Sequence, residues 1–175
     1  LETALVDTAF SVVSYQATDA LMTGQRPPRA GSGNPIAAPY QCYAARDGEF
    51  LLAAANERLW QRVLDVLDAP ALRADPRFVS AVERSRHRVA LEAELNARFA
   101  EASVDEWIGK LADAGVPATR VYGLEEAVVS EVARERRTFQ DCDGVPHVRL
   151  PWLVDVEPLP APAPAPRLGQ HTREV

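Results

Sequence analysis

The stretch RAGSGNPIAAPYQCYAARDGEFLLAA, residues 29–54, joins a glycine-rich loop to the pattern of a β-hairpin. Two strand-like runs flank Asp47-Gly48, a dipeptide that favours tight hairpin turns. The second run continues as unbroken apolar residues from Leu51 to Ala55, so we expect its strand to be buried on both faces. Tyr40 and Tyr43 are an odd number of positions apart, which predicts that they point to opposite faces of the first strand.

The loop before the hairpin contains Gly31-Ser32-Gly33, followed by Asn34 and Pro35. Glycine loses more backbone entropy on folding than other residues, so two glycines here need a reason. A tight turn is one reason, and a close approach to a ligand is the other. The loop alone predicts no more than a turn.

Helical patterns follow the hairpin, which predicts an α+β fold. Asn56 is expected to cap a first helix, and Asp75-Pro76 to begin a short second one. Ser103 and Glu106 have the spacing of a capping box at the start of a later helix. The apolar stripe of the helix between them consists of Val89, Leu91, Leu95 and Phe99.

The two ends of the chain differ from its middle. The opening LETALVDTAF is already helical in pattern, so we expect a helix from residue 1 or earlier to Leu21 or Met22, ended by Gly24. A domain seldom starts inside a helix, and we interpret the chain as a piece of a longer protein with an exposed apolar face over residues 5–21. Prolines at every second position from 158 to 166 predict an extended connector.

Composition limits the classes of function. The net charge of -6 disfavours a nucleic-acid or anionic-membrane partner, since both require a concentrated basic face. No apolar stretch approaches the length of a membrane span. Cys42 and Cys142 lack metal-binding spacing, and we interpret them as a buried, reduced pair in a cytoplasmic protein.

The usual catalytic and metal-binding motifs are absent from the sequence. His87, His147 and His171 have no neighbours at ligand spacing, and no nucleophile elbow, phosphate loop or dinucleotide fingerprint occurs. The arginines of RERR, residues 134–137, either hold a phosphate or complement the end of a helix. We therefore assign no catalytic residue, no metal ligand and no tightly bound cofactor.

The order of segments resembles the class III coenzyme A transferases, also called the CaiB/BaiF family. The similarity begins in the stretch VDTAFSVVSYQATDALMTGQRPPRAGSGNPIAAPYQCYAARDGEFLLAAANERLWQRVLDVLDAP and continues through ADPRF. It extends over SRHRVALEAELNARFAEASVDEWIGKLADAGVPATRVYGLEEAV and the closing RLGQHTREV. The resemblance covers nearly the whole chain, in the order and spacing of the family.

This resemblance implies a Rossmann-like large domain built from both ends of a longer chain, with a smaller α+β domain inserted between them. Residues 1–28 would be the last large-domain helix and its crossover. Residues 29–130 would form the small domain, and residues 131–175 would return to the large domain with the proline strap. Two such subunits would form an interlocked homodimer.

The resemblance also implies a reaction. In the family an aspartate carboxylate attacks an acyl-CoA thioester, and CoA passes to a second carboxylic acid through anhydride and thioester intermediates on the enzyme. The nucleophile would lie before residue 1, so this chain alone is expected to be inactive. The glycine loop would cover the reacting centre. The residues that the resemblance places at the substrate are Gly31, Ser32, Gly33, Asn34 and Tyr40.

Two other functions stay open. An α-methylacyl-CoA racemase shares the fold but works by proton transfer beside the thioester carbonyl, and its acid and base would also lie upstream. The second alternative is a stand-alone binding or assembly module that has the small-domain fold without catalysis.

Overall fold

A computed structural model describes residues 4–27 and 29–173, which form two compact units. The first unit extends to Val121 and the second begins at Tyr122. The first unit contains α1 (Leu5–Val12), α2 (Ser14–Thr23), β1 (Tyr40–Ala45), β2 (Gly48–Ala53), α3 (Glu57–Val66), α4 (Pro70–Ala74), α5 (Ala81–Arg86), α6 (Arg88–Phe99), α7 (Val104–Asp113) and β3 (Ala118–Arg120). The second contains α8 (Leu124–Ala127), α9 (Glu131–Glu135), β4 (Phe139–Cys142), β5 (Val145–Val148), β6 (Leu153–Val154) and β7 (Glu157–Pro158).

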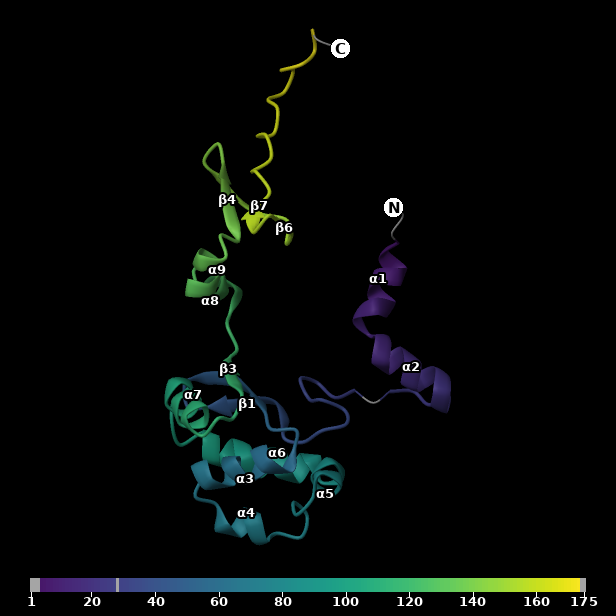
Figure 1. The fold of residues 1–175 in the computed structure, drawn as a ribbon, viewed down its shortest axis with the longest axis vertical. Coiled ribbons are helices and arrows are strands. Elements are labelled where there is room, and N and C mark those ends of the chain that lie inside the picture. The colour runs from purple at the N-terminus through teal and green to yellow at the C-terminus, as the bar shows by residue number, and fades with distance from the viewer. Residues whose placement is uncertain (1–3, 28, 174–175) are drawn as a thin grey trace. The chain divides into compact units, whose positions relative to one another are not determined.

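The first unit is organised around an antiparallel sheet of order β1-β2-β3 (Figure 1). The hairpin is present as predicted, but it pairs Ala45 with Gly48, so its turn consists of Arg46 and Asp47, one residue before the predicted Asp47-Gly48. β3, which is distant in sequence from the hairpin, pairs with β2 and places Arg120 opposite Phe50. β1 is therefore an edge strand, and its outer backbone groups need partners from outside the sheet.

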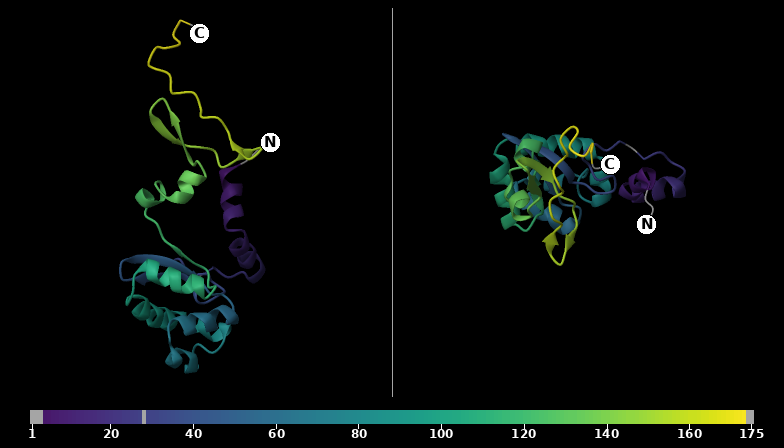
Figure 2. Two further views of the ribbon diagram at one scale, coloured as in Figure 1. Left: turned by 60° about the vertical axis from the view of Figure 1, so that its left-hand side comes forward. Right: turned by 90° about the horizontal axis from the view of Figure 1, so that it is seen from above.

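One face of this sheet forms the core, and the other is partly open. Phe50 and Leu52 are fully buried, whereas Leu51 and Ala53 are only half-buried. The prediction that β2 is buried on both faces is wrong. Helices α3 and α6 lie on the same side of the sheet (Figures 1 and 2), so only alternate residues of β2 reach the helices.

Phe99 is the centre of the core. Its ring lies 4.9 Å from the ring of Phe50, 5.3 Å from that of Tyr43 and 5.3 Å from that of Trp107, between centroids. The indole Nε1 of Trp107 donates to the carbonyl of Phe99 at 2.8 Å. These contacts join the hairpin, α6 and α7 into one apolar cluster.

Predicted caps fix two of the helices. The Asn56 side chain accepts from the amide of Leu59 and begins α3, and Ser103 and Glu106 form the predicted capping box of α7. The prediction of a helix beginning at Asp75-Pro76 is wrong. The Asp75 carboxylate instead accepts from the amide of Arg77 at 2.8 Å in a turn, and this turn directs Phe78 into the core.

The N-terminal helical segment is divided. The sequence predicts one helix, but α1 ends at Val12 and α2 starts at Ser14, with Val13 at φ −106° and ψ 28°. Two adjacent β-branched residues and a serine have low helix propensity, which explains the break there. Gly24 ends α2 in the left-handed conformation, as predicted. The predicted start at or before residue 1 lies outside the described residues.

The apolar face predicted over residues 5–21 is exposed. Leu5 is 92% exposed, Val12 78% and Leu21 87%, and neither α1 nor α2 contributes a buried residue. Among the described residues, every helix is too short or too polar to cross a lipid bilayer.

The second unit consists of two short helices and two small hairpins. The sequence predicts a single helix over residues 124–137. Ser130 interrupts it, since its hydroxyl donates to the carbonyl of Ala127 and accepts from the amide of Ala133. The proline segment is extended, as predicted, and is bound to β4: Gln140 Nε2 donates to the carbonyl of Leu159 at 2.7 Å, and Cys142 Sγ to that of Pro162 at 3.0 Å.

Helices and antiparallel sheets in these proportions confirm the predicted α+β class. The assignment of residues 1–28 and 131–175 to a large domain, and of residues 29–130 to a small one, stays a prediction.

Candidate functional site

The segment between α2 and the sheet, residues 29–38, is called the glycine loop below. It packs along the free edge of β1. Ser32 Oγ accepts from the backbone amide of Cys42 at 3.1 Å, and the amide of Asn34 donates to the carbonyl of Tyr40 at 2.8 Å. The loop thereby supplies partners for an edge strand that would otherwise offer them to solvent.

The two glycines of the loop are required for different reasons. Gly31 has φ +57°, in the left-handed region, while a Cβ added to it would meet nothing within 4 Å. Gly33 does not have a positive φ, but a Cβ there would lie 2.7 Å from Arg88 Nη1 and 2.9 Å from the carbonyl oxygen of Ala30. Gly31 thus makes a turn, and Gly33 allows a close approach. The approaching group belongs to this chain.

Two arginines hold the end of the loop. Arg84 Nε donates to the carbonyl of Ala38 at 3.0 Å, and Arg88 Nη2 donates to the carbonyl of Ala37 at 3.2 Å. Consecutive loop carbonyls are thus bound by guanidinium groups four residues apart. Charged donors make stronger hydrogen bonds than neutral ones, so this pair anchors the backbone just before β1.

Arg84 is fully buried and also contacts helix α3 and the turn that contains Phe78. Its Nη1 donates to the carbonyl of Phe78 at 3.1 Å, and its Nη2 pairs with Glu57 at 3.0 Å. Its guanidinium lies 5.2 Å from the ring centroid of Trp60. A buried cation is tolerated only when its donors are satisfied, and three acceptors and an aromatic face achieve this here.

The predicted site residues fall into one region. The loop residues Gly31, Ser32, Gly33 and Asn34 are contiguous, and Tyr40 is joined to them through the amide of Asn34. Tyr40 is half-buried on the open face of the sheet, and Tyr43 is 2% exposed in the core, so their predicted opposition is confirmed. Desolvation, with repulsion from Glu92, raises the pKa of Tyr43 well above its ordinary value, so it stays a neutral phenol.

Sequence reasoning missed Arg84, Arg88 and Asn96. The Asn96 side chain accepts from the amide of Ala44 at 3.0 Å and completes the edge of β1. The arginines had a detectable signal: they continue the buried stripe of Leu91 and Leu95 toward the N-terminus at helical spacing. A charged residue on a core stripe indicates a buried partner.

Other candidate groups do not converge. Among the described residues, no three His, Cys, Asp or Glu side chains gather at metal-binding distance. Both cysteines are free, Cys142 buried as expected and Cys42 only half-buried because it faces the open side of the sheet. In the second unit, Arg134 lies in the last turn of α9, while Arg137 pairs with Glu157 at 2.8 Å.

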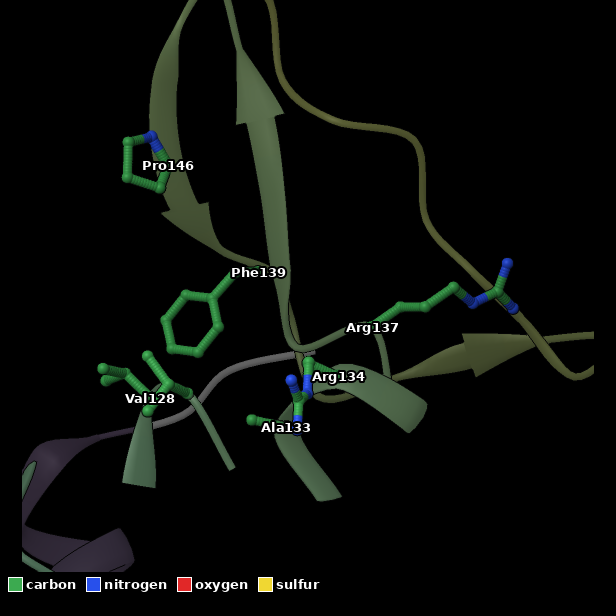
Figure 3. A pocket seen from close by; sticks show the side chains of 7 residues that line it. Val128, Ala133, Arg134, Arg137, Phe139 and Pro146 are labelled. Carbon is green, nitrogen blue, oxygen red and sulfur yellow. The ribbon is translucent and has the colours of Figure 1, made fainter. Parts of the chain in front are cut away.

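A pocket of about 760 Å³ lies in the second unit. Figure 3 shows Phe139 beside Val128, with Arg134 next to Ala133, whereas Arg137 points away from them. Arg134 and Arg137 therefore point in different directions, which does not favour a single phosphate site formed by these two arginines. The lining residues are Val128, Val129, Ala133, Arg134, Arg137, Phe139 and Pro146.

Comparison with known families gives a match to the model described as CoA-transferase family III, over residues 1–172. The chain belongs to CoA-transferase family III. The resemblance found in the sequence is thereby confirmed.

Characterised relatives of this family member carry transferase names. The chain is 25% identical to a succinate–glutarate CoA-transferase of Agrobacterium fabrum, over all of this chain and 45% of the relative. It is 33% identical to an acetyl-CoA:oxalate CoA-transferase of Acetobacter aceti, over 60% of this chain and 27% of the relative. The chain thus spans less than half the length of these relatives.

A solved structure of a CaiB/BaiF family protein from Brucella suis has the same fold as this family III chain. The TM-score is 0.82 at 30% identity, covering 96% of this chain and 44% of the other. This similarity agrees with an α+β domain of a class III CoA transferase.

Proposed function

We propose that this chain forms the glycine-loop side of the active site in an acyl-CoA:carboxylate CoA-transferase. The match to CoA-transferase family III over residues 1–172 supports this function more than any other observation. Relatives named for oxalate, succinate and glutarate suggest that the substrates are the CoA thioester of one small carboxylic acid and a second, free acid.

The proposed reaction uses an enzyme carboxylate contributed from outside residues 1–175. This carboxylate attacks the thioester carbonyl, which forms a mixed anhydride and releases the CoA thiolate. The thiolate then attacks the enzyme's acyl carbon, which gives an enzyme thioester and frees the first acid. The acceptor carboxylate attacks that thioester to form a second anhydride, releasing the thiolate again. Attack of the thiolate on the acceptor's acyl carbon gives the new acyl-CoA and restores the enzyme carboxylate.

The role of this chain is to cover that carboxylate and exclude water. An acyl anhydride is readily hydrolysed. Attack of one water molecule on the anhydride would release the free acid, and no new thioester would form. Gly31 and Gly33 keep the loop thin enough for backbone to approach the reacting carbon, and Ser32, Asn34 and Tyr40 are proposed to face the substrate. Two hydrogen bonds support this role because they give the loop a defined position: the Cys42 amide donates to Ser32 Oγ, and the Asn34 amide donates to the Tyr40 carbonyl.

The test is an exchange assay with the full-length protein. We expect that incubation with succinyl-CoA and a panel of dicarboxylates gives a new acyl-CoA, identified by mass spectrometry. The 175-residue chain alone is expected to give none, because the proposed nucleophile lies outside it. Transfer by the isolated chain, or no transfer by the full-length protein with any acid, would contradict the proposal.

The two alternatives give different signals in the same preparation. A racemase would exchange the α-proton of a 2-methylacyl-CoA for deuterium without forming a new thioester. A binding or assembly module would do neither. The interlocked homodimer, the cytoplasmic location and the domain limits at residues 28 and 130 are parts of the proposal that sedimentation, cell fractionation and an experimental structure would test.

A further inference from the structure

We propose that Arg88 is a positioning residue, which holds the glycine loop in the conformation that excludes water from the reacting centre. This inference rests on the proposed function for its catalytic consequence. The geometry that carries it belongs to the first unit alone.

The first observation is the fit between Arg88 and Gly33. Arg88 Nη1 lies 2.7 Å from the point that a Cβ on Gly33 would occupy, and Gln41 Oε1 lies 3.3 Å from the same point. The guanidinium therefore lies directly beneath the loop, in space available only because residue 33 has no side chain.

The second observation is the hydrogen bond from Arg88 Nη2 to the carbonyl of Ala37 at 3.2 Å. It fixes the loop four residues beyond Gly33, so one guanidinium supports the loop at two points. Within the described residues, no carboxylate forms an ion pair with Arg88. Its hydrogen bond goes to the loop backbone.

The third observation is that the helix carrying Arg88 is firmly packed in the core. Arg88 is the first residue of α6, a helix anchored by the fully buried side chains of Leu91, Leu95 and Phe99. Arg88 is half-buried, which limits the freedom of its side chain. A donor fixed to the core can transmit that order to a loop that has two glycines and little burial of its own.

Arg88 differs from Arg84 in what else it supports. Arg84 also binds Phe78 and Glu57, so its loss would disturb the fold as well as the loop. The hydrogen bond of Arg88 reaches only the loop, and replacing it should loosen the loop while leaving the core intact.

The first experiment measures amide hydrogen exchange over residues 30–37 in the 175-residue chain, without substrate. We expect Arg88→Ala to raise exchange in this peptide at least about 10-fold, since the protecting hydrogen bonds of Gly33 and Asn34 open more often. Arg88→Lys should restore part of the protection.

The matched control is Arg86→Ala, two residues away and with a 69% exposed side chain, which should leave amide exchange in the loop unchanged. Core unfolding, followed by Trp60 and Trp107 fluorescence in a Trp152→Phe background, should stay within error of the parent for both Arg88→Ala and Arg86→Ala.

The second experiment measures transfer and hydrolysis separately in the full-length protein. Transfer is followed as new acyl-CoA, and hydrolysis as free CoA thiol released without an acceptor acid. A loosened loop admits water, so Arg88→Ala should raise the ratio of hydrolysis to transfer at least about 10-fold, with KM for the acyl-CoA changed by less than about 3-fold. Arg88→Lys should give an intermediate ratio.

The outcomes separate this inference from the proposed function. If loop exchange does not rise in Arg88→Ala, Arg88 does not position the loop and the inference is wrong. Faster loop exchange with an unchanged hydrolysis ratio would overturn the water-excluding role. If the parent protein transfers no CoA at all, the proposed function fails, and the exchange result alone supports or overturns Arg88 as the anchor of the loop.

Discussion

Arg88 Nη1 lies 2.7 Å from the position that a Cβ on Gly33 would take. Gly31, two residues earlier, has open space around its own Cβ position but adopts φ +57°. Glycine is therefore required at position 33 by a neighbouring side chain, and at position 31 by the backbone conformation. The distinction gives each position a different expected response to substitution.

Gly33→Ala should loosen the loop more than Gly31→Ala. The new methyl group at 33 meets both Arg88 and the Ala30 carbonyl at 2.9 Å, and the carbonyl is backbone that cannot turn aside. Gly31→Ala should cost only about 1 kcal/mol, the strain of a left-handed alanine. Amide exchange over residues 30–37 compares the two. In an Arg88→Ala background, Gly33→Ala should raise amide exchange by a smaller factor than in the parent. If the effects of the two substitutions on exchange were fully additive, the contact between Arg88 and residue 33 would not contribute to loop order.

Arg84→Met should destabilise the first unit strongly. Methionine leaves the carbonyls of Ala38 and Phe78 without their donor, which should lower the free energy of unfolding by about 3 kcal/mol. Urea unfolding followed by Trp60 and Trp107 fluorescence measures it, in a Trp152→Phe background because Trp152 is 65% exposed. Arg86→Ala on the same helix should change stability by less than about 0.5 kcal/mol. Equal effects of the two substitutions would refute the assigned role of Arg84.

Phe99→Ala should be among the most destabilising core substitutions. The ring contacts Tyr43, Phe50 and Trp107, and its removal leaves a cavity shared by the hairpin, α6 and α7. We expect a loss of about 3–5 kcal/mol by the same fluorescence measurement. Val89→Ala is the control, because Val89 lies on the same helix and is 82% exposed; its predicted place on the apolar stripe with Leu91 and Leu95 is wrong. A loss below about 1 kcal/mol for Phe99→Ala would contradict this central position.

The capping box of α7 predicts a pH dependence of stability. Glu106 accepts from the amide and hydroxyl of Ser103, at 2.8 and 2.7 Å, and these hydrogen bonds hold the pKa of its carboxyl below the ordinary value. Because the folded pKa is lowered, this stabilisation is complete above the unfolded pKa of about 4.3 and is lost as pH falls through the folded pKa. Glu106→Gln removes the titrating group, so its stability should fall less than that of the parent between about pH 5 and pH 3. If the free energy of unfolding fell equally with pH in the parent and in Glu106→Gln, Glu106 would not be the source of this pH dependence.

Ser103→Ala tests the same helix start at neutral pH. The serine accepts from the amide of Glu106 at 3.3 Å, and its loss should cost about 1 kcal/mol. Ser85→Ala is a control at a half-buried serine of α5 that caps no helix. It should have less effect in urea unfolding, and a larger effect would indicate that capping is not what makes Ser103 important.

Much of the fold could be predicted because it depends on neighbours in sequence. The hairpin turn in the segment 46–48, the caps Asn56 and Ser103, and the helix end at Gly24 each depend on a few neighbouring residues. The opposite faces of Tyr40 and Tyr43 follow from the two-residue period of a strand. Separately from these signals, the order and spacing of the quoted sequence segments carried the resemblance to class III CoA transferases.

The errors arose where competing local partners or the extent of packing decided the structure. Asp75 has the chemistry of a helix cap, but its carboxylate is taken by Arg77 in a turn, and burial of Phe78 stabilises that arrangement. An apolar run cannot show whether helices cover one face of a strand or both, so the half-exposed Leu51 could not be foreseen.

The glycine loop shows the same division between local and tertiary causes. Its two glycines could be recognised as unusual in the sequence, but the partners that explain them are distant. Arg84 and Arg88 bind carbonyls 46 and 51 positions away, and both residues belong to a segment that is strongly charged in sequence. Local chemistry therefore set the turns, the caps and the faces of the strands. Only the packing of α5 and α6 against the hairpin could decide that two guanidinium groups would be held beneath the loop, because a buried charge depends on acceptors that the folded chain alone brings together.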